Sequence, residues 1–162
     1  MLPRLSIVVA FTQRPPHLDR CLDSIEGGRY PRDLLELIVV DNRSCAESIR
    51  MAREHGAVVV KSTGTLAELL NVGARAALGD ILVFVSPESE VEAGWFDRVV
   101  DVLTNGSAGW LAPGKMAIRR TPFEAVGTFD PSGFVRADDD ICHRLRLAGH
   151  QVTVERQPTA AA

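Results

Sequence analysis

The best candidates for chemistry in this chain are the oxygen-bearing side chains of Ser86, Glu88 and Glu90. They follow the unbroken apolar run 81–85, and Pro87 stops that run. A continuous run of β-branched and aromatic residues is typical of a strand buried on both faces, and proline cannot continue the hydrogen-bonded ladder. We therefore expect these side chains at the carboxyl end of a central strand, where open α/β sheets bind ligands.

Acidic residues occupy two further positions at the ends of predicted elements. Asp41 begins the polar turn 41–44 after the apolar run 35–40, and the three acids 138–140 open an amphipathic helix. Carboxylates at a helix start complement the positive end of the helix dipole, so capping alone would explain the three acids. An Asp at this point can likewise serve only its own turn.

Alternating strands and helices are needed to place these acids. Apolar runs predict strands at 5–11, 35–40, 57–60 and 81–85, and the segments between them carry apolar residues at helical spacing. Strands that alternate with helices imply an α/β fold with a mostly parallel, Rossmann-like sheet and right-handed crossovers. The turns after the first, second and fourth strands should consequently open on one edge of the sheet and form a composite pocket there.

Two capping boxes predict where helices begin. Ser44 is followed three residues later by Glu47, and Thr65 is followed in the same way by Glu68. In such a box the hydroxyl accepts a hydrogen bond from the backbone N–H of the third helical residue, whose carboxylate accepts the N–H of the cap. We expect one helix to begin after each box.

The last third of the chain is less regular but contains no linker. Residues 110–118 have the composition of a strand that a Pro-Gly pair interrupts, and residues 150–155 should form a final strand. Residues 1–156 are therefore predicted to form a single domain, and 157–162 a frayed tail.

Composition excludes several classes of function. The 162 residues are 46% hydrophobic, which is enough to bury a core. A formal net charge of −3 without any basic block argues against nucleic-acid and anionic-membrane binding. The apolar runs are too short for a membrane span and no signal peptide precedes the first strand, so we expect a cytoplasmic protein. The three cysteines lack metal-type spacing and should be reduced packing residues.

Several different short motifs follow one another along the chain. They are a polar loop with Arg14-Pro15, Val39 to Ser44, Gly64 with Asn71-Val72-Gly73, Gly79 to Phe84, Met116 to Arg120, Glu124 to Asp130, and Asp138 to Gly149. Each motif is weak alone, but their order and spacing together are specific. Through them the chain resembles the inverting, family 2 glycosyltransferases of the GT-A fold. The resemblance implies a GT-A-like sheet and a sugar donor activated as a nucleotide diphosphate.

The resemblance also implies a donor site at the carboxyl ends of the strands. Asp41 matches the family acid that binds the base or ribose of the donor, a role that needs an ionised acceptor. The alternative for Asp41 is a residue that only caps its turn. Asn42, Gly64, Asn71 and Ser86 belong to the motifs of the loops expected around the donor.

A divalent metal, Mg²⁺ or Mn²⁺, is implied beside the donor diphosphate. The family holds it with an Asp-x-Asp motif at the end of the fourth strand, because hard cations prefer oxygen ligands. Ser86, Pro87 and Glu88 occupy those positions here. Glu88 is then the metal ligand, alone or with Glu90, unless both acids simply face water.

Asp138 matches the family's general base, which takes a proton from the attacking acceptor hydroxyl. Ala137 replaces the acid that usually stands beside this base, and Leu70 replaces an arginine before Asn71. The donor side of the family pattern is therefore better kept than the acceptor side.

Two functions fit these residues. The first is a minimal, inverting family 2-like glycosyltransferase that binds a nucleotide sugar and an unidentified acceptor, with low activity as an isolated chain. The alternative is a catalytically degenerate GT-A domain that serves as a nucleotide-binding or scaffold module for a protein partner in a larger assembly. Ser86, Leu70 and Ala137 favour the alternative. A redox dinucleotide-binding domain fits less well, because no Gly-x-Gly-x-x-Gly motif follows the first strand.

Overall fold

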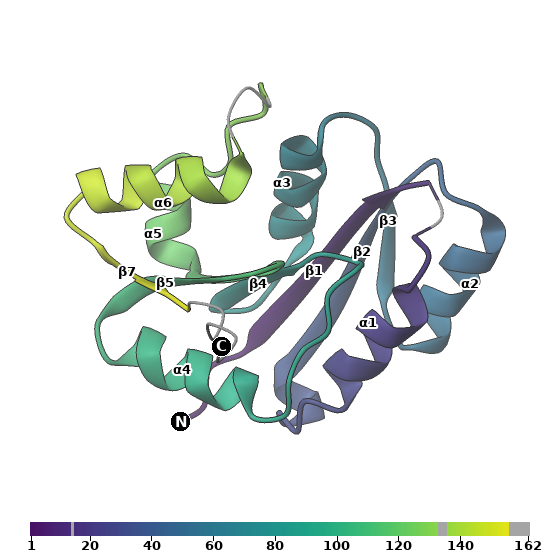
Figure 1. Ribbon diagram of the computed structural model, residues 1–162, viewed down its shortest axis with the longest axis horizontal. Helices are drawn as coiled ribbons and strands as arrows, with labels where there is room; N and C mark the ends of the chain where they lie inside the picture. Colours follow the sequence, from purple (N-terminus) through teal and green to yellow (C-terminus); the bar gives the residue numbers. More distant parts are fainter. Residues whose placement is uncertain (14, 133–135, 156–162) are drawn as a thin grey trace, which may run out of the picture.

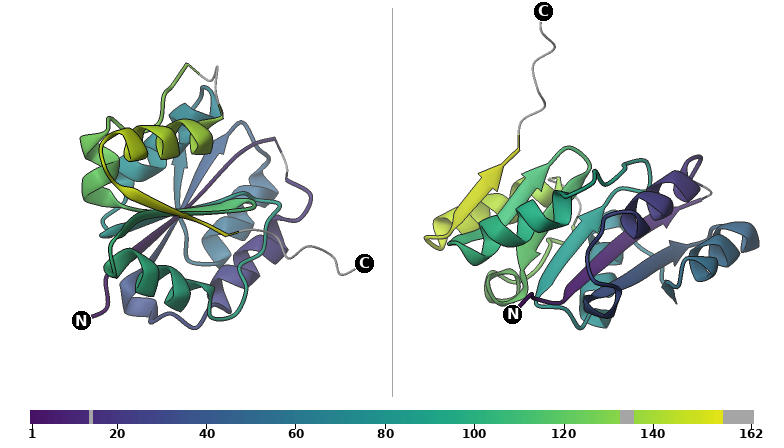
Figure 2. Two further views of the ribbon diagram at one scale, coloured as in Figure 1. Left: turned by 60° about the vertical axis from the view of Figure 1, so that its left-hand side comes forward. Right: turned by 90° about the horizontal axis from the view of Figure 1, so that it is seen from below.

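A seven-stranded sheet with helices on both faces forms the framework of the molecule (Figures 1 and 2). The computed structural model describes residues 1–13, 15–132 and 136–155. The elements follow in the order β1 (Leu5–Thr12), α1 (Leu18–Glu26), the 3₁₀ helix η1 (Arg32–Leu34), β2 (Leu35–Asn42), α2 (Ala46–Glu54), β3 (Val58–Lys61), α3 (Leu66–Ala76), β4 (Ile81–Val85), α4 (Trp95–Thr104), β5 (Ser107–Ala112), β6 (Lys115–Arg119), α5 (Arg120–Ala125), α6 (Ala137–Leu147) and β7 (Gln151–Val154).

The strand order β3-β2-β1-β4-β6-β5-β7 confirms the predicted α/β class. Strands β1 to β4 are parallel, β6 is antiparallel to both β4 and β5, and β7 is parallel to β5. On β1, Val8 lies opposite Ile38 of β2 and Phe84 of β4. Because β1, β2 and β4 point the same way, their carboxyl ends meet at one edge of the sheet, as predicted. We call this the carboxyl edge.

The alternation of side chains along β1 divides the core into two layers. Ile7 and Val9 lie in the layer with α1 and α4, whereas Val8 and Ala10 lie in the layer with α3, α5 and α6. This is the period of two expected for a strand that is buried on both faces. The second layer is tight, since a Cβ atom added to Gly73 of α3 would lie 2.3 Å from Cγ1 of Val8.

The region predicted as one interrupted strand is a β-hairpin. β5 and β6 pair in antiparallel fashion on either side of Pro113-Gly114, and Gly114 has a φ of 70°, where glycine is favoured. A Cβ atom at Gly114 would lie 1.9 Å from Oγ of Ser89, so the loop after β4 packs directly on this turn. The prediction was wrong because strand-like composition continues on both sides of the Pro-Gly pair, which reverses the chain instead of merely interrupting it.

One of the two predicted capping boxes forms. Oγ1 of Thr65 accepts the N–H of Glu68 at 3.2 Å, and Oε2 of Glu68 accepts the N–H of Thr65 at 2.6 Å. The box predicted at Ser44 does not form, because α2 has Cys45 as its N-cap, without a side-chain cap hydrogen bond. The N–H of Ser44 donates instead to Oδ1 of Asp41 at 3.1 Å. The turn that Asp41 stabilises therefore determines how the chain enters α2.

A single sheet runs through the described residues, as predicted for one domain. The predicted boundary at residue 156 and the predicted frayed tail 157–162 lie outside the described residues. No helix in the described part of the chain combines the length and the hydropathy needed to cross a bilayer.

Candidate functional site

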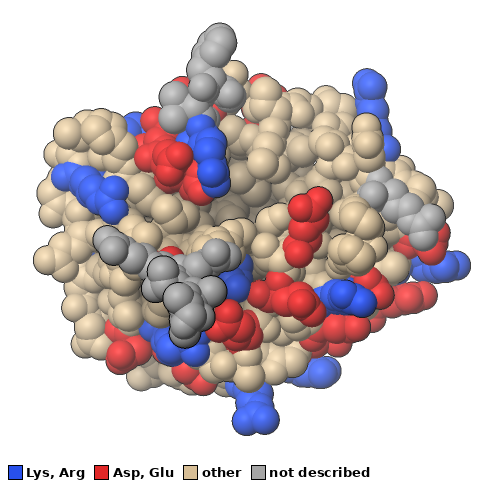
Figure 3. All heavy atoms as spheres, viewed as in Figure 1, with Lys and Arg blue, Asp and Glu red and all other residues tan. Residues whose placement is uncertain are grey.

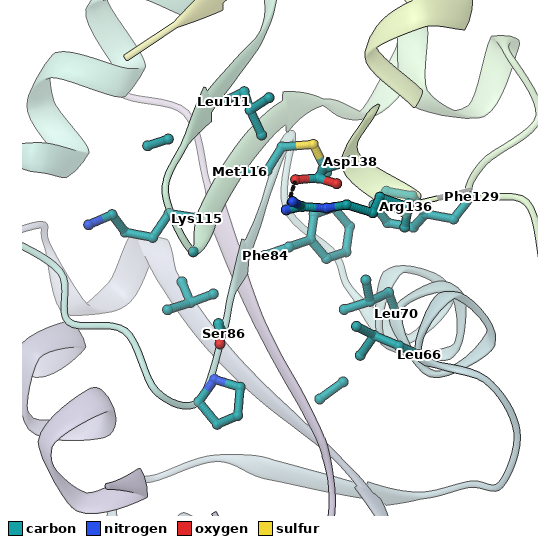
Figure 4. A pocket seen from close by; sticks show the side chains of 16 residues that line it. Leu66, Leu70, Phe84, Ser86, Leu111, Lys115, Met116, Phe129, Arg136 and Asp138 are labelled. Atoms are coloured by element: carbon teal, nitrogen blue, oxygen red, sulfur yellow. Dashed lines mark hydrogen bonds and ion pairs between the residues drawn. The ribbon is translucent and has the colours of Figure 1, made fainter. Parts of the chain in front are cut away.

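A pocket of about 280 Å³ opens at the carboxyl edge, between the end of β4 and the start of α6 (Figure 4). It brings together two residues of the predicted site, Ser86 after β4 and Asp138 in the first turn of α6. The rest of its wall is mainly apolar and includes Leu66, Leu70, Phe84, Leu111, Met116 and Phe129. The order of strands thus joins residues that are far apart in the sequence.

Asp138 differs in its surroundings from the two acids that follow it. Its carboxylate accepts a hydrogen bond from Nη2 of Arg136 at 3.1 Å and another from the N–H of Asp139 at 3.0 Å. Asp140 forms an ion pair within its own helix, with 2.7 Å between the charged atoms, and the side chain of Asp139 is 62% exposed. Of the three acids, Asp138 alone lines the pocket. Capping explains all three by position, but it does not explain this difference.

The charged residues that line the pocket are Lys115, Arg136 and Asp138. Figure 4 shows Arg136 reaching Asp138, whereas the side chain of Lys115 points away from both. Nζ of Lys115 donates to the carbonyl oxygen of Glu90 at 2.9 Å and lies 5.6 Å from the centre of the Trp95 ring. The pocket therefore combines an apolar wall with one ion pair. On the face shown in Figure 3, basic side chains are interspersed with acidic ones.

The loop 86–91 is anchored at both ends. At its start the N–H of Ser86 donates to the carbonyl oxygen of Gly114 at 2.8 Å. At its end the N–H of Val91 donates to Oγ of Ser24 at 2.9 Å. The hairpin turn and α1 together hold the loop in place.

Glu88 lies on this loop but outside the wall of the pocket. Its side chain is exposed, and its N–H donates to Oγ of Ser86 at 3.5 Å. One carboxylate beside a hydroxyl offers few oxygen ligands, but Mg²⁺ commonly keeps waters and takes phosphate oxygens as its other ligands. The two residues therefore fit a divalent cation that is held mainly by a phosphate-bearing ligand.

Asp41, Asn42 and Gly64 form a second group at the carboxyl edge. Asp41 is 4% exposed, and Nδ2 of Asn42 donates to the carbonyl oxygen of Gly64 at 3.4 Å. Gly64 has a φ of 130°, and a Cβ atom there would lie 1.9 Å from Oε2 of Glu68. Glycine is thus required at this position to leave room for the carboxylate of the capping box. The three residues lie outside the wall of the 280 Å³ pocket.

Asn71 contacts the backbone of the later part of the chain. Its Nδ2 donates to the carbonyl oxygen of Phe129 at 2.9 Å, and its Oδ1 accepts the N–H of Phe129 at 3.0 Å. The ring of Phe129 lines the pocket and packs edge-on against Phe84, with 4.9 Å between ring centres. Asn71 therefore positions part of the pocket wall, and its contact with a donor stays a prediction.

Arg136 and most of the apolar wall were missed by reasoning from the sequence. Arg136 ends the segment 129–136, whose composition is that of a loop. The available signal was the position of an arginine two residues before Asp138, from which a long side chain can fold back onto the first helical turn. Phe129 and Leu66 gave no comparable signal, because their role depends on contacts between distant segments.

The sequence matches a family model described as "Glycosyl transferase family 2" over residues 6–128. The curated relatives include the uncharacterized glycosyltransferase EpsJ of Bacillus subtilis (strain 168), 26% identical over 107 residues, which are 62% of this chain and 30% of that protein. They also include a probable N-acetylgalactosaminyltransferase 9 of Caenorhabditis elegans, 27% identical over 128 residues, 69% of this chain and 21% of that protein. The matched part of the chain thus corresponds to less than a third of the length of these relatives.

Solved structures share the fold. The mannosyltransferase PcManGT from Pyrobaculum calidifontis, in complex with GDP-Man and Mn²⁺, superposes with a TM-score of 0.84 at 22% identity, over 99% of this chain and 59% of that one. TarS 1–349 of S. aureus, in complex with UDP-GlcNAc, gives a TM-score of 0.80 at 13% identity, over 98% of this chain and 61% of that one. The predicted GT-A-like fold is confirmed by these likenesses.

Proposed function

The chain belongs to glycosyl transferase family 2, and on that basis we propose that it binds a nucleotide-diphosphate sugar at the carboxyl edge and transfers the sugar to an acceptor. The observation that carries the proposal is the pocket in which Ser86 and Asp138 meet at this edge. Structures of the same fold contain GDP-Man and UDP-GlcNAc, which supports a nucleotide sugar as the class of donor.

In this proposal the nucleotide lies over Asp41, Asn42 and Gly64. The carboxylate of Asp41 already accepts the N–H of Ser44, but a carboxylate has about four lone-pair sites and can accept further hydrogen bonds. It would accept from a ribose hydroxyl or a base N–H. Asn42 and Gly64 would supply the surface against which the nucleotide packs.

Glu88 and the hydroxyl of Ser86 would hold a divalent cation, Mg²⁺ or Mn²⁺, beside the diphosphate. The Mn²⁺ in the PcManGT complex supports a cation of this kind. Such a cation supplies positive charge that stabilises the diphosphate as a leaving group. The anchored loop 86–91 presents both side chains from a fixed backbone.

Asp138 would act as the general base. Its carboxylate takes the proton of an acceptor hydroxyl, whose oxygen forms a bond to the anomeric carbon while the bond from that carbon to the diphosphate oxygen breaks. Attack from the face opposite the leaving group makes the transfer inverting. Arg136 must first give up or share its hydrogen bond to Asp138. The apolar wall would keep water from competing with the acceptor.

A second function, a nucleotide-binding or scaffold module without turnover, is supported by three substitutions in the pocket. Ser86 stands where the family has a metal-binding acid, and Leu70 and Ala137 present apolar side chains to the pocket. Nη2 of Arg136 also lies 3.1 Å from Oδ2 of Asp138, so an acceptor hydroxyl would compete with this guanidinium for the carboxylate. Low or absent activity in the isolated chain would agree with this function.

Calorimetric titration with UDP, GDP and dTDP, with and without Mn²⁺, tests the donor site. We expect one of them to bind more tightly when Mn²⁺ is present, and replacing Ser86 with Asp, together with Pro87 with Ala, should strengthen that binding severalfold by adding a second carboxylate. Absence of binding to all three nucleotides, with and without Mn²⁺, would refute the donor site.

Turnover of the matching nucleotide sugars separates the two functions. If the chain is an enzyme, Asp138→Asn should lower kcat by about 10² to 10⁴ while leaving nucleotide affinity unchanged. Asp139→Asn is the matched control, because that acid is exposed, lies outside the pocket wall and approaches Nε of Arg136 at 4.0 Å, beyond hydrogen-bond distance. Nucleotide binding without turnover would establish the binding module instead.

A further inference from the structure

Three side chains at the opposite edge of the sheet are placed as ligands for a metal ion. Asp23 and Glu26 belong to the last turn of α1, His55 follows the end of α2, and one ligand atom from each lies within 4.8 Å of the others. Both helices run from the carboxyl edge back to the edge where the strands begin (Figure 1). This group is therefore separate from the proposed donor site and from Glu88.

Both ring nitrogens of His55 face oxygen atoms that accept hydrogen bonds. Nδ1 lies 2.9 Å from the carbonyl oxygen of Met51, and Nε2 lies 2.8 Å from Oδ1 of Asp23. A carbonyl oxygen and a carboxylate are acceptors, whereas a neutral imidazole has a single N–H to donate. With Nδ1–H donated to Met51, Nε2 faces the carboxylate of Asp23, and the position between these two atoms suits a cation.

The surroundings of this group suit a metal ion. Metal-binding histidines usually donate their other ring N–H to a carbonyl or carboxylate, as His55 does to Met51, which orients the ring. The side chain of His55 is 15% exposed and that of Asp23 is 71% exposed, so the imidazole is held while the carboxylate is free to move. A metal ion with bonds of about 2.0–2.2 Å needs Nε2 of His55 and Oδ1 of Asp23 slightly further apart than 2.8 Å. The exposed side chain of Asp23 can move by this amount. Arg32 lines the same hollow as Glu26 and His55, and its positive charge disfavours binding of a cation there.

We propose that Asp23, Glu26 and His55 bind a divalent transition-metal ion of the Zn²⁺ type. One imidazole and two carboxylates are ligands that Zn²⁺ accepts, and water completes its coordination. The ion would join the ends of α1 and α2, which are separate in the sequence. Its role is therefore structural and independent of the transfer reaction.

Titration of the nucleotide-free protein with Zn²⁺ after removal of metal by EDTA tests this site. We expect one ion to bind, release of a proton on binding, and at least tenfold weaker binding in the double variant Asp23→Asn with Glu26→Gln. His55→Gln should weaken binding as strongly. Glu54→Gln is the matched control, because this exposed acid of α2 pairs with Arg50 and lies outside the group.

Binding of Co²⁺ in place of Zn²⁺ gives an independent readout. Co²⁺ bound by four or five ligands absorbs visible light more strongly than hydrated Co²⁺ does. A visible absorption band of this kind in the wild-type protein that is lost in the double variant would support the site. Circular dichroism of the double variant should match the wild type, since both acids are exposed. Equal Zn²⁺ affinity in the two proteins, or no Zn²⁺ binding at all, would refute the metal site.

Discussion

Both halves of the sheet pack through buried apolar side chains, but the second half also depends on arginine contacts to backbone carbonyls. In the first half, β1 to β4 with α1 to α3, parallel strands and helices pack through side chains at regular spacing. In the second half, β5 to β7 with α4 to α6, apolar packing of the same kind is supplemented by side chains that bind distant backbone carbonyls. Arg120 donates to the carbonyl oxygens of Gly79 at 2.7 Å and Ala77 at 2.8 Å, and Arg144 donates to those of Val126 and Thr128. Gly79 and Ala77 precede β4, so Arg120 joins the second half to the first, whereas Arg144 holds a segment within the second half.

This difference matters for the candidate site because the pocket lies across the boundary between the halves. Ser86 comes from the first half and Asp138 from the second. Asn71 of the first half holds the backbone of Phe129 in the second. Residues at the boundary should therefore affect both stability and the shape of the pocket.

The largest effect is expected from Phe129→Ala. The ring of Phe129 is 1% exposed and lies 4.9 Å from Phe84 and 5.2 Å from Phe123, measured between ring centres. Loss of this buried ring should lower the free energy of unfolding by about 3–5 kcal/mol, measured by urea denaturation. Leu147→Ala is the control, since Leu147 is 74% exposed and its loss should cost less than about 0.5 kcal/mol. Similar costs for the two variants would place little stability at the boundary.

A somewhat smaller effect is expected from Asn71→Ala. The substitution leaves a buried N–H and a buried carbonyl oxygen of Phe129 without their partner, at a cost of about 2–4 kcal/mol. Asn71→Asp keeps an acceptor for the N–H and should lie between the wild type and the Ala variant. Should Asn71→Ala instead abolish nucleotide binding at unchanged stability, the residue would belong to the donor site and not to the boundary.

Asp41→Ala tests the first half alone and should weaken nucleotide binding at least about tenfold. A hydrogen bond to a charged group contributes about 1.5–3 kcal/mol, which corresponds to tenfold or more in affinity. Asp41→Asn removes the negative charge but keeps an oxygen atom that can accept the N–H of Ser44. The variant therefore distinguishes the effect of the charge on nucleotide binding from the effect of the turn. Wild-type affinity in the Ala variant, measured by calorimetry, would limit Asp41 to its turn.

The smallest effect concerns the pH dependence of the link between α1 and α2, in the absence of metal. Partial burial acts to lower the pKa of His55, but its hydrogen bonds to Asp23 and Met51 and the nearby carboxylates outweigh this and raise the pKa. Because this pKa is higher in the folded than in the unfolded state, protonated His55 stabilises the fold fully below the unfolded pKa of about 6.5. This contribution is lost as pH rises through the folded-state pKa.

The effect on stability should be small because Asp23 is largely exposed to solvent. Urea midpoints between about pH 5 and pH 9, with EDTA present, should fall with rising pH more in the wild type than in His55→Gln. Parallel pH profiles for the two proteins would mean that the ion pair adds no stability. Neither profile should depend on the contacts of Phe129, which lies in the other half.

The first half could be predicted from the sequence because its signals are local. Apolar runs gave β1, β2 and β4, and the Thr65 and Glu68 pair gave the start of α3. The box expected at Ser44 was wrong because a neighbouring carboxylate, Asp41, competes for the same backbone N–H. In the second half, the helix opened by the acids 138–140 and the last strand were also predicted and are α6 and β7. The hairpin and the contacts of Arg120 and Arg144 were not, because these side chains bind carbonyls far from them in sequence.

The residues of the candidate site that could be predicted are those at the end of a strand or at the start of a helix. Ser86 and Asp138 are such residues, and the structure brings them into one pocket. Glu88 was expected beside them but lies outside the wall, because the chain turns at Pro87 and directs its side chain to solvent. Phe129 and Arg136 enter the pocket from a segment whose composition indicates only a loop. Their part in the site follows from tertiary packing.

The anchoring of the loop 86–91 changes the entropy of binding at Glu88. Ordering a flexible backbone costs about 1–2 kcal/mol per residue, and that cost reduces the affinity of a ligand that must immobilise its own site. Here the hydrogen bonds of Ser86 and Val91 order the backbone when the protein folds, before any ligand arrives. Because the loop is preorganised, Glu88 would bind a cation more tightly than the same carboxylate on a flexible loop. The absence of a second acid therefore lowers the affinity less than the number of ligands alone implies.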